Sequence, residues 1–328
     1  MTKSLTLLQI GNAPRLVGGT AACIWTAVRA LPQLNHRVLF LGNSNPETSR
    51  HFPVPVNYDA RPTTATILDL SPDLILLHNV APHRVNLPSE IPVVQYVHSA
   101  GKHAPAAQTV YCSRWLANQL DAKSPSVLLQ AVPKPTSSST ENRTLREELI
   151  VGRICTPDAR KWPPRMIDFY QTLARQWPRI QWEFVGCPAS LQQELAQACA
   201  GQVRFFPASW TARTHLCRWD ALLYSNPQLP ESFGRTVAES MRAGCIPIVD
   251  HQGGFIEQLA DGGGCTCRTD EDFASSLSHL IDPLNRRHLS LSAERLGDER
   301  FSLRRFGKDL LRVFASAASS SISCQFVK

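Results

Sequence analysis

Short apolar runs alternate with amphipathic stretches along the 328 residues of this chain. In the first half, apolar runs predict buried strands at residues 5–10, 37–41, 74–77 and 93–97. Helical patterns lie between or after them, at about residues 20–31 and 115–120. Short apolar strands that alternate with helices are typical of a parallel sheet with helices on both faces.

The second half repeats this alternation. Strands are predicted at residues 150–154, 181–185, 203–206 and 221–224, and helices at 165–177, 191–199 and 271–280. Another apolar run, 246–249, follows a helical stretch. The pattern therefore indicates two Rossmann-like halves, each of which binds ligands at the carboxyl ends of its strands. We expect chemistry in the loops after Ile10, Val97, Val151 and Tyr224.

A proline- and serine-rich stretch over residues 133–142 has nothing to bury and is typical of a linker. We therefore predict an N-terminal, acceptor-side domain at residues 1–135 and a linker at 136–146. A C-terminal donor domain at 147–300 follows, and then a C-terminal helix and tail at 301–328.

Composition restricts the class of protein. A hydrophobic content of 43% and a charged content of 19% are typical of a folded globular protein. The first apolar run is too short for a signal peptide, and no run is long enough to cross a bilayer. We therefore expect a cytoplasmic protein whose ten cysteines are reduced thiols. A metal or redox role for Cys265 and Cys267 is the alternative for that close pair.

The net charge of +7 favours anionic partners, namely nucleotide diphosphates, anionic lipids or nucleic acid. Nucleic acid is the least favoured, because no basic run is interleaved with aromatic residues, and we expect none to bind. Basic and aromatic residues mix at positions 301–314. That segment predicts either a packed terminal helix with a solvated basic face or a helix at a membrane surface, so peripheral membrane contact is left open.

The strongest chemical signal is the stretch from Glu231 to Glu239, with Phe233 and Gly234 between the two carboxylates. It reads as a loop that turns into a helix, whose N-terminus offers unpaired N–H groups to a phosphate. Glycine lets a ligand approach the backbone closely. Glu239 lies just past the first helical turn, where it can reach a polyol beside that phosphate. The alternative is an ordinary amphipathic helix with solvated carboxylates.

This stretch resembles the donor-site signature of glycosyltransferases of the GT-B fold, especially the retaining glycosyltransferase family 4 (glycosyl transferases group 1). In the family, the pattern E-x-F-G-x4-E is followed by a small-residue strand like G-x-P-V-V and then by G-G-x-x-E. The equivalent run here consists of Glu231, Phe233, Gly234, Glu239, Gly244, Pro247, Gly253, Gly254 and Glu257. The resemblance covers residues 151–314 well and the first domain loosely. It implies an α/β protein of GT-B architecture, in which two Rossmann-like domains with parallel sheets face one another across a cleft.

The resemblance implies roles for the residues of the signature. Glu231 would contact the hydroxyls of the donor sugar, and Glu239 the ribose hydroxyls, since a carboxylate can accept two hydrogen bonds from a diol. Backbone N–H groups near Arg235 and Thr236, after Gly234, would hold the phosphates. Phe233 would shape the loop.

Two cations would neutralise the departing diphosphate in place of a metal. The resemblance gives these roles to Arg153 and Lys161. Their spacing is longer than is usual for the family, so Arg160 is a rival for the second role. No metal is expected: the acidic triplet at Asp270, Glu271 and Asp272 precedes an apolar helical run, where acidic residues favour the helix N-terminus.

The first domain matches less well. Gly18, Gly19 and Thr20 follow the first strand and open a helix, and the resemblance implies phosphate approach and acceptor placement for them; a tight turn is the alternative. His98 follows the strand at 93–97, where the family often has a histidine near the transferred sugar. A hydrogen-bonded structural histidine is the alternative there.

The sequence as a whole therefore predicts a retaining, metal-independent glycosyltransferase of the hexosyltransferase type. It would move a sugar from a UDP- or GDP-sugar, its co-substrate, to a hydroxyl acceptor on a glycan, a lipid or a small molecule, with no other cofactor. The alternatives are another GT-B enzyme, such as a sugar-nucleotide epimerase or phosphorylase, and a non-catalytic nucleotide-sugar-binding scaffold.

Overall fold

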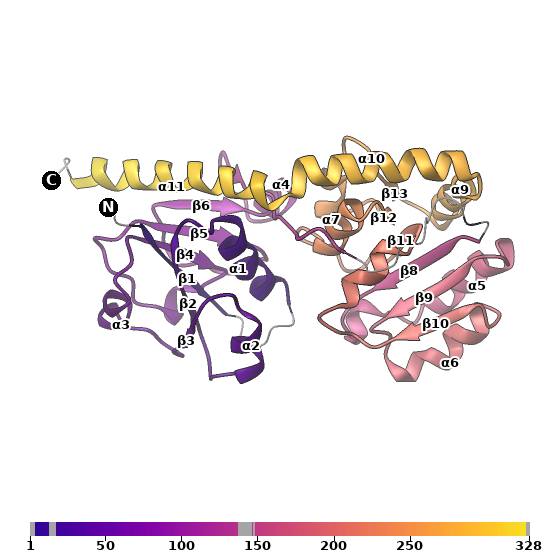
Figure 1. Ribbon diagram of the computed structural model, residues 1–328, viewed down its shortest axis with the longest axis horizontal. Helices are drawn as coiled ribbons and strands as arrows, with labels where there is room; N and C mark the ends of the chain where they lie inside the picture. Colours follow the sequence, from indigo (N-terminus) through magenta and orange to yellow (C-terminus); the bar gives the residue numbers. More distant parts are fainter. Residues whose placement is uncertain (1–3, 13–17, 137–145, 147, 326–328) are drawn as a thin grey trace. The chain divides into compact units, whose positions relative to one another are not determined.

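The computed structural model describes residues 4–12, 18–136, 146 and 148–325, with backbone alone for 320–325 (Figure 1). The chain divides into two compact units, Met1–Val132 with Phe301–Lys328, and Pro133–Arg300. The linker expected at residues 136–146 lies almost entirely outside the described residues. Each unit is built on one parallel sheet, so the predicted pair of Rossmann-like domains is confirmed; their placement across a cleft stays a prediction.

The first unit holds a seven-stranded sheet in the order β3-β2-β1-β4-β5-β6-β7. The strands are β1 (Thr6–Gly11), β2 (Asn35–Phe40), β3 (Val56–Tyr58), β4 (Leu74–His78), β5 (Val93–Val97), β6 (Gln108–Tyr111) and β7 (Ser126–Val127). The helices of this unit are α1 (Gly19–Ala30), α2 (Pro46–His51), α3 (Thr64–Asp69), α4 (Arg114–Gln119) and α11 (Leu303–Gln325). The short 3-10 helix η1 covers Pro82–Arg84.

The C-terminal helix α11 belongs to the first unit, where it packs on α1, β5 and β6 (Figure 1). Phe306, Leu310 and Phe314 are buried on one side of it, whereas Arg304 and Arg312 are exposed. This confirms the packed terminal helix with a solvated basic face. These three side chains are therefore enclosed within the first unit.

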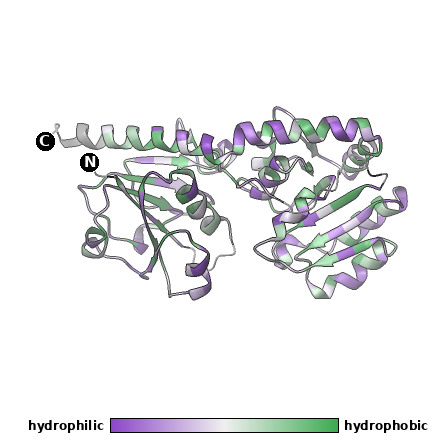
Figure 2. Cartoon of the chain, viewed as in Figure 1, coloured by the Kyte–Doolittle hydropathy of each residue, from purple (hydrophilic) through white to green (hydrophobic). Residues whose placement is uncertain are grey.

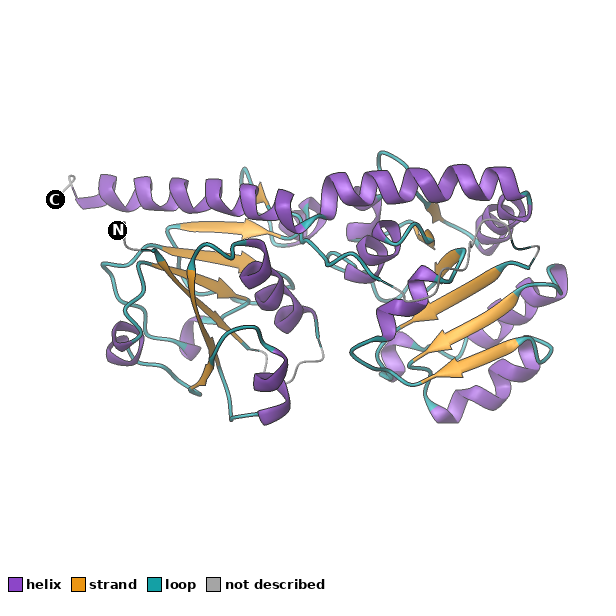
Figure 3. Cartoon of the chain, in the orientation of Figure 1, coloured by secondary structure: helices purple, strands orange, loops and turns teal. Residues whose placement is uncertain are grey.

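The second unit holds a six-stranded sheet in the order β10-β9-β8-β11-β12-β13 (Figure 3). The strands are β8 (Ile150–Ile154), β9 (Gln181–Val185), β10 (Val203–Phe206), β11 (Ala221–Tyr224), β12 (Ile246–Asp250) and β13 (Cys265–Cys267). The helices are α5 (Met166–Gln176), α6 (Ala189–Ala198), α7 (Arg235–Arg242), α8 (Gly254–Gln258), α9 (Asp270–Ile281) and α10 (Pro283–Phe301), with 3-10 turns η3 (Ala159–Lys161) and η4 (Ala212–Cys217).

Apolar residues prevail along the central strands (Figure 2), as expected for a parallel sheet whose two faces are covered by helices. In the first sheet Leu8, Ile10 and Leu77 are fully buried, and in the second Val151 and Leu223 are fully buried. This explains why the sequence shows apolar runs and not a strict alternation at these strands. The strands predicted from those runs are confirmed within one or two residues.

Both sheets reverse their strand order next to the first strand of the unit. In the second unit the reversal lies between β8 and β11, which pair in parallel. The loops that leave their carboxyl ends diverge there, and this is where open α/β sheets bind ligands. Residues 155–165 follow β8 and residues 225–234 follow β11, so both loops arrive at one point.

The described residues also give observations on helix capping, on the cysteines and on the apolarity of the helices. Thr269 and Asp272 form a capping box at the start of α9, which confirms that the acidic triplet caps a helix. Cys265 and Cys267 are free thiols. Within the described residues, no group of His, Cys, Asp and Glu has the arrangement of a metal site. Of the helices traced here, none combines the length and apolarity of a membrane span.

Candidate active site

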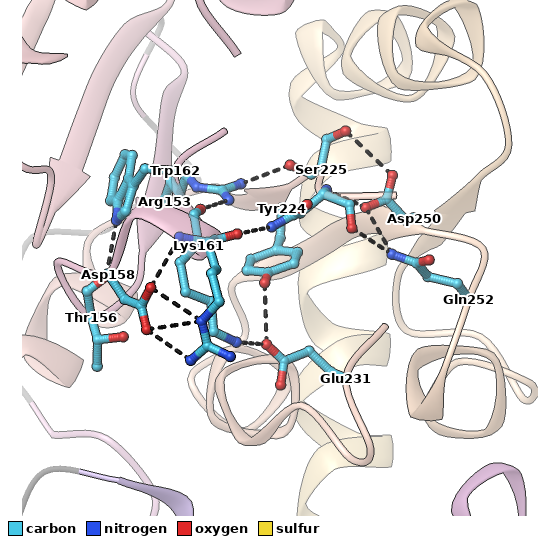
Figure 4. Close-up of polar contacts among 12 residues, drawn as sticks. Arg153, Thr156, Asp158, Lys161, Trp162, Tyr224, Ser225, Glu231, Asp250 and Gln252 are labelled. Atoms are coloured by element: carbon cyan, nitrogen blue, oxygen red, sulfur yellow. Dashed lines mark hydrogen bonds and ion pairs between the residues drawn. The ribbon is translucent and has the colours of Figure 1, made fainter. Parts of the chain in front are cut away.

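Lys161 and Glu231 come together at the strand reversal of the second unit. Lys161 ends the η3 turn after β8, and Glu231 lies in the loop after β11. The Lys161 ammonium forms an ion pair with the Glu231 carboxylate, to which the Tyr224 hydroxyl also donates at 3.1 Å. Figure 4 shows both donors directed at that carboxylate. The Lys161 and Glu231 side chains are about one quarter exposed (23% and 26%), so a ligand can reach both.

Arg153 lies behind this pair and is fully buried. Its guanidinium lies 4.5 Å from the Tyr224 ring centroid and 5.2 Å from that of Trp162. Nη2 donates to the Lys161 carbonyl at 2.7 Å, and Nη1 donates to the Ser225 carbonyl at 3.3 Å. A residue with no exposed surface cannot touch a ligand in this conformation. The expected direct contact of Arg153 with a diphosphate is therefore corrected: the fork fixes the backbone of both loops.

Arg160, the rival for the second cation role, pairs with a different carboxylate. Its guanidinium forms an ion pair with Asp158 at 2.8 Å, and its side chain is 74% exposed. The Asp158 carboxylate also accepts the Arg160 backbone N–H and so caps the η3 turn. Hydrogen bonds from Arg160 lower the pKa of the Asp158 carboxyl. The geometry therefore favours Lys161 over Arg160 as the cation beside Glu231.

Asp250, at the end of β12, anchors the loop after β11. One carboxylate oxygen accepts the Asn226 backbone N–H, and the other accepts the Ser225 hydroxyl at 3.3 Å. The Asn226 side chain then donates to the Arg160 carbonyl at 2.7 Å, so the two loops are joined. Burial raises the pKa of Asp250 in spite of these bonds. Nothing in the sequence pattern around Asp250 indicates this role, beyond its place at a strand end.

Helix α7 begins beside this pair. Gly234 is its N-cap and adopts a left-handed conformation with φ of 86°. A side chain there would also collide with Phe255, whose ring carbon lies 2.2 Å from the position of a Cβ. Arg235 and Thr236 form the first turn, and Phe233 is buried beside them. Phe233 thus shapes the loop from the core, and the first turn of α7 presents its N–H groups at the carboxyl edge of the sheet.

Glu239 lies one turn further along α7 and is only 2% exposed. Its Oε1 atom accepts from Arg213 Nε at 2.6 Å and lies 3.9 Å from Arg235. Both of these ion pairs use the same carboxylate oxygen. The residue is therefore more enclosed than a solvated carboxylate on an amphipathic helix, which excludes that alternative for Glu239.

The candidate residues of the first unit lie on separate elements. Gly18 is the N-cap of α1, with φ of 143°, and Gly19 and Thr20 open that helix after β1. His98 follows β5 and is 8% exposed. Its ring packs against Tyr96 at 4.4 Å between centroids and against His78 at 5.2 Å. The structure thus gives His98 the surroundings of a packed aromatic residue.

A buried polar chain crosses the first unit and was not anticipated from the sequence. His78 Nε2 lies 3.0 Å from the Gln9 side-chain oxygen Oε1. The Gln9 side-chain nitrogen Nε2 lies 3.5 Å from His36 Nδ1. His36 Nε2 in turn lies 2.8 Å from the Leu31 carbonyl. Burial lowers the pKa of His78 to about 3 and also lowers that of His36. Both residues are neutral near pH 7, since each pKa lies below its ordinary value.

No protein-family model and no curated protein sequence matches this chain. Solved structures do. HepE of Anabaena, in a complex with UDP, superposes with a TM-score of 0.74 at 16% identity, over 95% of this chain and all of that one (100%). Sucrose-phosphate synthase from Thermosynechococcus elongatus superposes with a TM-score of 0.69 at 14% identity, covering 96% of this chain and 100% of its own.

WaaG, a glycosyltransferase involved in lipopolysaccharide biosynthesis, gives a TM-score of 0.65 at 13% identity, over 93% of this chain and 99% of its own. These likenesses extend over both units, and the sequence identities are low. What they establish is the architecture: the chain has the GT-B fold.

Proposed function

We propose that this protein is a glycosyltransferase that takes a sugar from a nucleotide diphosphate sugar and transfers it to a hydroxyl acceptor. The observation that carries the proposal is the meeting of Lys161 and Glu231 beside the start of α7, at the strand reversal of the second sheet. A cation and helix N–H groups suit a diphosphate, and a carboxylate suits sugar hydroxyls. HepE, which has the same fold, has been solved with UDP-glucose, and this supports a UDP-sugar as donor.

In this proposal Lys161 contacts the diphosphate and stabilises the negative charge that grows as the glycosidic bond breaks. Arg153 holds the Lys161 and Ser225 carbonyls and so positions the two loops. The phosphates lie at the N–H groups of Arg235 and Thr236. The Glu239 oxygen that does not bind Arg213 takes the ribose hydroxyls.

We further propose, from the family 4 resemblance, that transfer retains the anomeric configuration and needs no metal. The leaving phosphate would then help to deprotonate the acceptor, and no protein side chain acts as nucleophile. The same resemblance gives Gly18, Gly19 and Thr20 roles in phosphate approach and acceptor placement, and gives His98 contact with the transferred sugar or acceptor-side chemistry. The acceptor is a glycan, a lipid or a small molecule.

The test begins with thermal unfolding in the presence of UDP-, GDP- and ADP-sugars. A ligand at 100 times its Kd stabilises the folded state by about 2.7 kcal/mol, so the donor is found as the compound that raises Tm. The selected donor is then incubated with candidate acceptors, and the anomeric configuration of the product is read by NMR, with and without EDTA. Stabilisation without any turnover would instead indicate a binding scaffold, and turnover of the donor with no acceptor would indicate an epimerase.

A further inference from the structure

The two side chains that the proposed function assigns to the donor bind each other in this structure. Lys161 and Glu231 form an ion pair and are 70 residues apart in the chain. Because Glu231 already holds the Lys161 ammonium, a diphosphate that binds Lys161 competes with the Glu231 carboxylate for that ammonium and is repelled by its negative charge. The ion pair is therefore a competitor of the ligand, built into the site.

The backbone around this pair is held on both sides. The Lys161 carbonyl accepts from Arg153, and the preceding carbonyl of Arg160 accepts from Asn226, each at 2.7 Å. The Glu231 carbonyl accepts from the Gly254 N–H at 2.8 Å. The side chains of Lys161 and Glu231 can therefore exchange each other for a ligand while the backbone of both loops stays in place.

Displacement costs more for some ligands than for others. A free nucleotide diphosphate takes Lys161 and leaves the Glu231 carboxylate beside the phosphates, with the Tyr224 hydroxyl as its donor at 3.1 Å. A carboxylate and phosphates at short range repel one another, and a partly buried carboxylate needs hydrogen-bond donors. A nucleotide sugar brings such donors, because an ionised carboxylate is an acceptor only and sugar hydroxyls can donate to it.

We propose that Glu231 is a specificity-determining residue that selects the nucleotide sugar against the free nucleotide diphosphate, through its competition for Lys161. The inference rests on the proposed function and adds a consequence to it. Once the sugar has left, the hydroxyl donors to Glu231 leave with it. The carboxylate then reclaims Lys161 and favours release of the nucleotide product.

The experiment measures affinity for UDP, GDP, ADP and inorganic pyrophosphate by calorimetry, in the wild type and in Glu231→Gln. The amide keeps the size of the side chain and removes the charge that competes for Lys161. We expect the variant to bind pyrophosphate and the preferred nucleotide diphosphate about tenfold more tightly, an effect between those of exposed and buried ion pairs. The affinity for the matching nucleotide sugar is expected to rise less or to fall.

Asp158→Asn is the matched control. It removes one negative charge from the same loop but leaves the Lys161–Glu231 pair intact, since Asp158 pairs with Arg160. Its affinity for pyrophosphate is expected to stay within about twofold, because the charge it removes is solvent-screened. In addition, the gain from Glu231→Gln is expected to vanish when Lys161→Gln is present, which a purely structural role of Glu231 would not produce.

The outcomes separate cleanly. Unchanged or weaker binding of pyrophosphate and nucleotide diphosphates by a folded Glu231→Gln variant overturns the inference, and Glu231→Ala repeats the test if the first variant does not fold. Equal tightening by Asp158→Asn overturns it as well, since the effect would then be one of net charge. If the wild type and all variants bind none of the four probes and no UDP-, GDP- or ADP-sugar, the proposed function itself fails.

Discussion

Replacing Gly254 by alanine should damage the loop that carries Glu231. The added Cβ would lie 2.6 Å from the Ser232 carbonyl oxygen, and 2.8 and 2.9 Å from the Cα and carbonyl oxygen of Phe233. Ordinary van der Waals contact begins near 3.4 Å, so these atoms have to move by about 0.5 to 0.8 Å. They belong to the backbone, which has no other rotamer to adopt. We expect a loss of unfolding free energy of about 1–3 kcal/mol, the usual cost of overpacking.

The same displacement should reach the ligand. Gly254 N–H binds the Glu231 carbonyl, so a shift of the loop moves Glu231 relative to Lys161. A misplacement of about 1 Å can lower turnover about 100-fold. Thermal unfolding should show a Tm lower by about 2–8 °C, and pyrophosphate calorimetry and the transfer assay should show weaker binding and turnover.

Unfolding of Gly19→Ala gives the baseline for a glycine-to-alanine change, since its added methyl group would meet no atom within 4 Å. Unchanged Tm and unchanged turnover in Gly254→Ala would refute the argument, because the backbone would then have room that these distances exclude.

Three further predictions concern buried polar groups. Arg153→Lys should lower the unfolding free energy by about 2 kcal/mol, because an ammonium cannot span the carbonyls of both loops. It should also weaken pyrophosphate binding, as measured by calorimetry. The control Arg160→Lys should change neither quantity. Burial holds the pKa of His78 at about 3. The contribution of this residue to the unfolding free energy is therefore constant above pH 6.5 and falls by about 1.4 kcal/mol per pH unit below pH 6.5. Urea unfolding at pH 7.5 and 5.0 should show this loss of stability, and the loss should be smaller in His78→Gln. The pKa of Glu183 is lowered, since hydrogen bonds from His215, Trp219 and Arg218 outweigh burial. The ionised carboxylate therefore stabilises the fold above the ordinary pKa, and this stability is lost as the pH falls through the pKa of the folded state. Glu183→Gln should lower the unfolding free energy by about 2 kcal/mol at pH 7 and make that free energy less dependent on pH in the acid range.

The alternation of apolar runs was enough to predict the fold class and most central strands. Strands of this kind are buried on both faces, so their composition is constrained at every position. The strands that the pattern missed, β3, β6, β7 and β13, are short or lie toward the sheet edges, where half-exposed polar residues are tolerated. The residue types of an edge strand are less constrained, because one side of the strand has no neighbouring strand.

The local motif placed Glu231, Gly234 and Glu239 correctly around the start of α7, because a loop–helix junction is a matter of a few consecutive residues. It could not show that Arg153 would be buried, since that depends on Trp162 and Tyr224 enclosing its guanidinium. It also gave no sign of Asp250 as the anchor of the neighbouring loop. Contacts of this kind join residues that the chain separates by tens of positions.

The sequence by itself determined two parallel-sheet units and the loop–helix junction between Glu231 and Glu239, because periodicity and turn chemistry are local properties. Tertiary structure alone decided which cation stands beside Glu231. Lys161 reaches it because β8 and β11 are neighbours in the sheet, so that the loops after them meet at one point, whereas Arg160, one position earlier, is turned to solvent by the η3 turn.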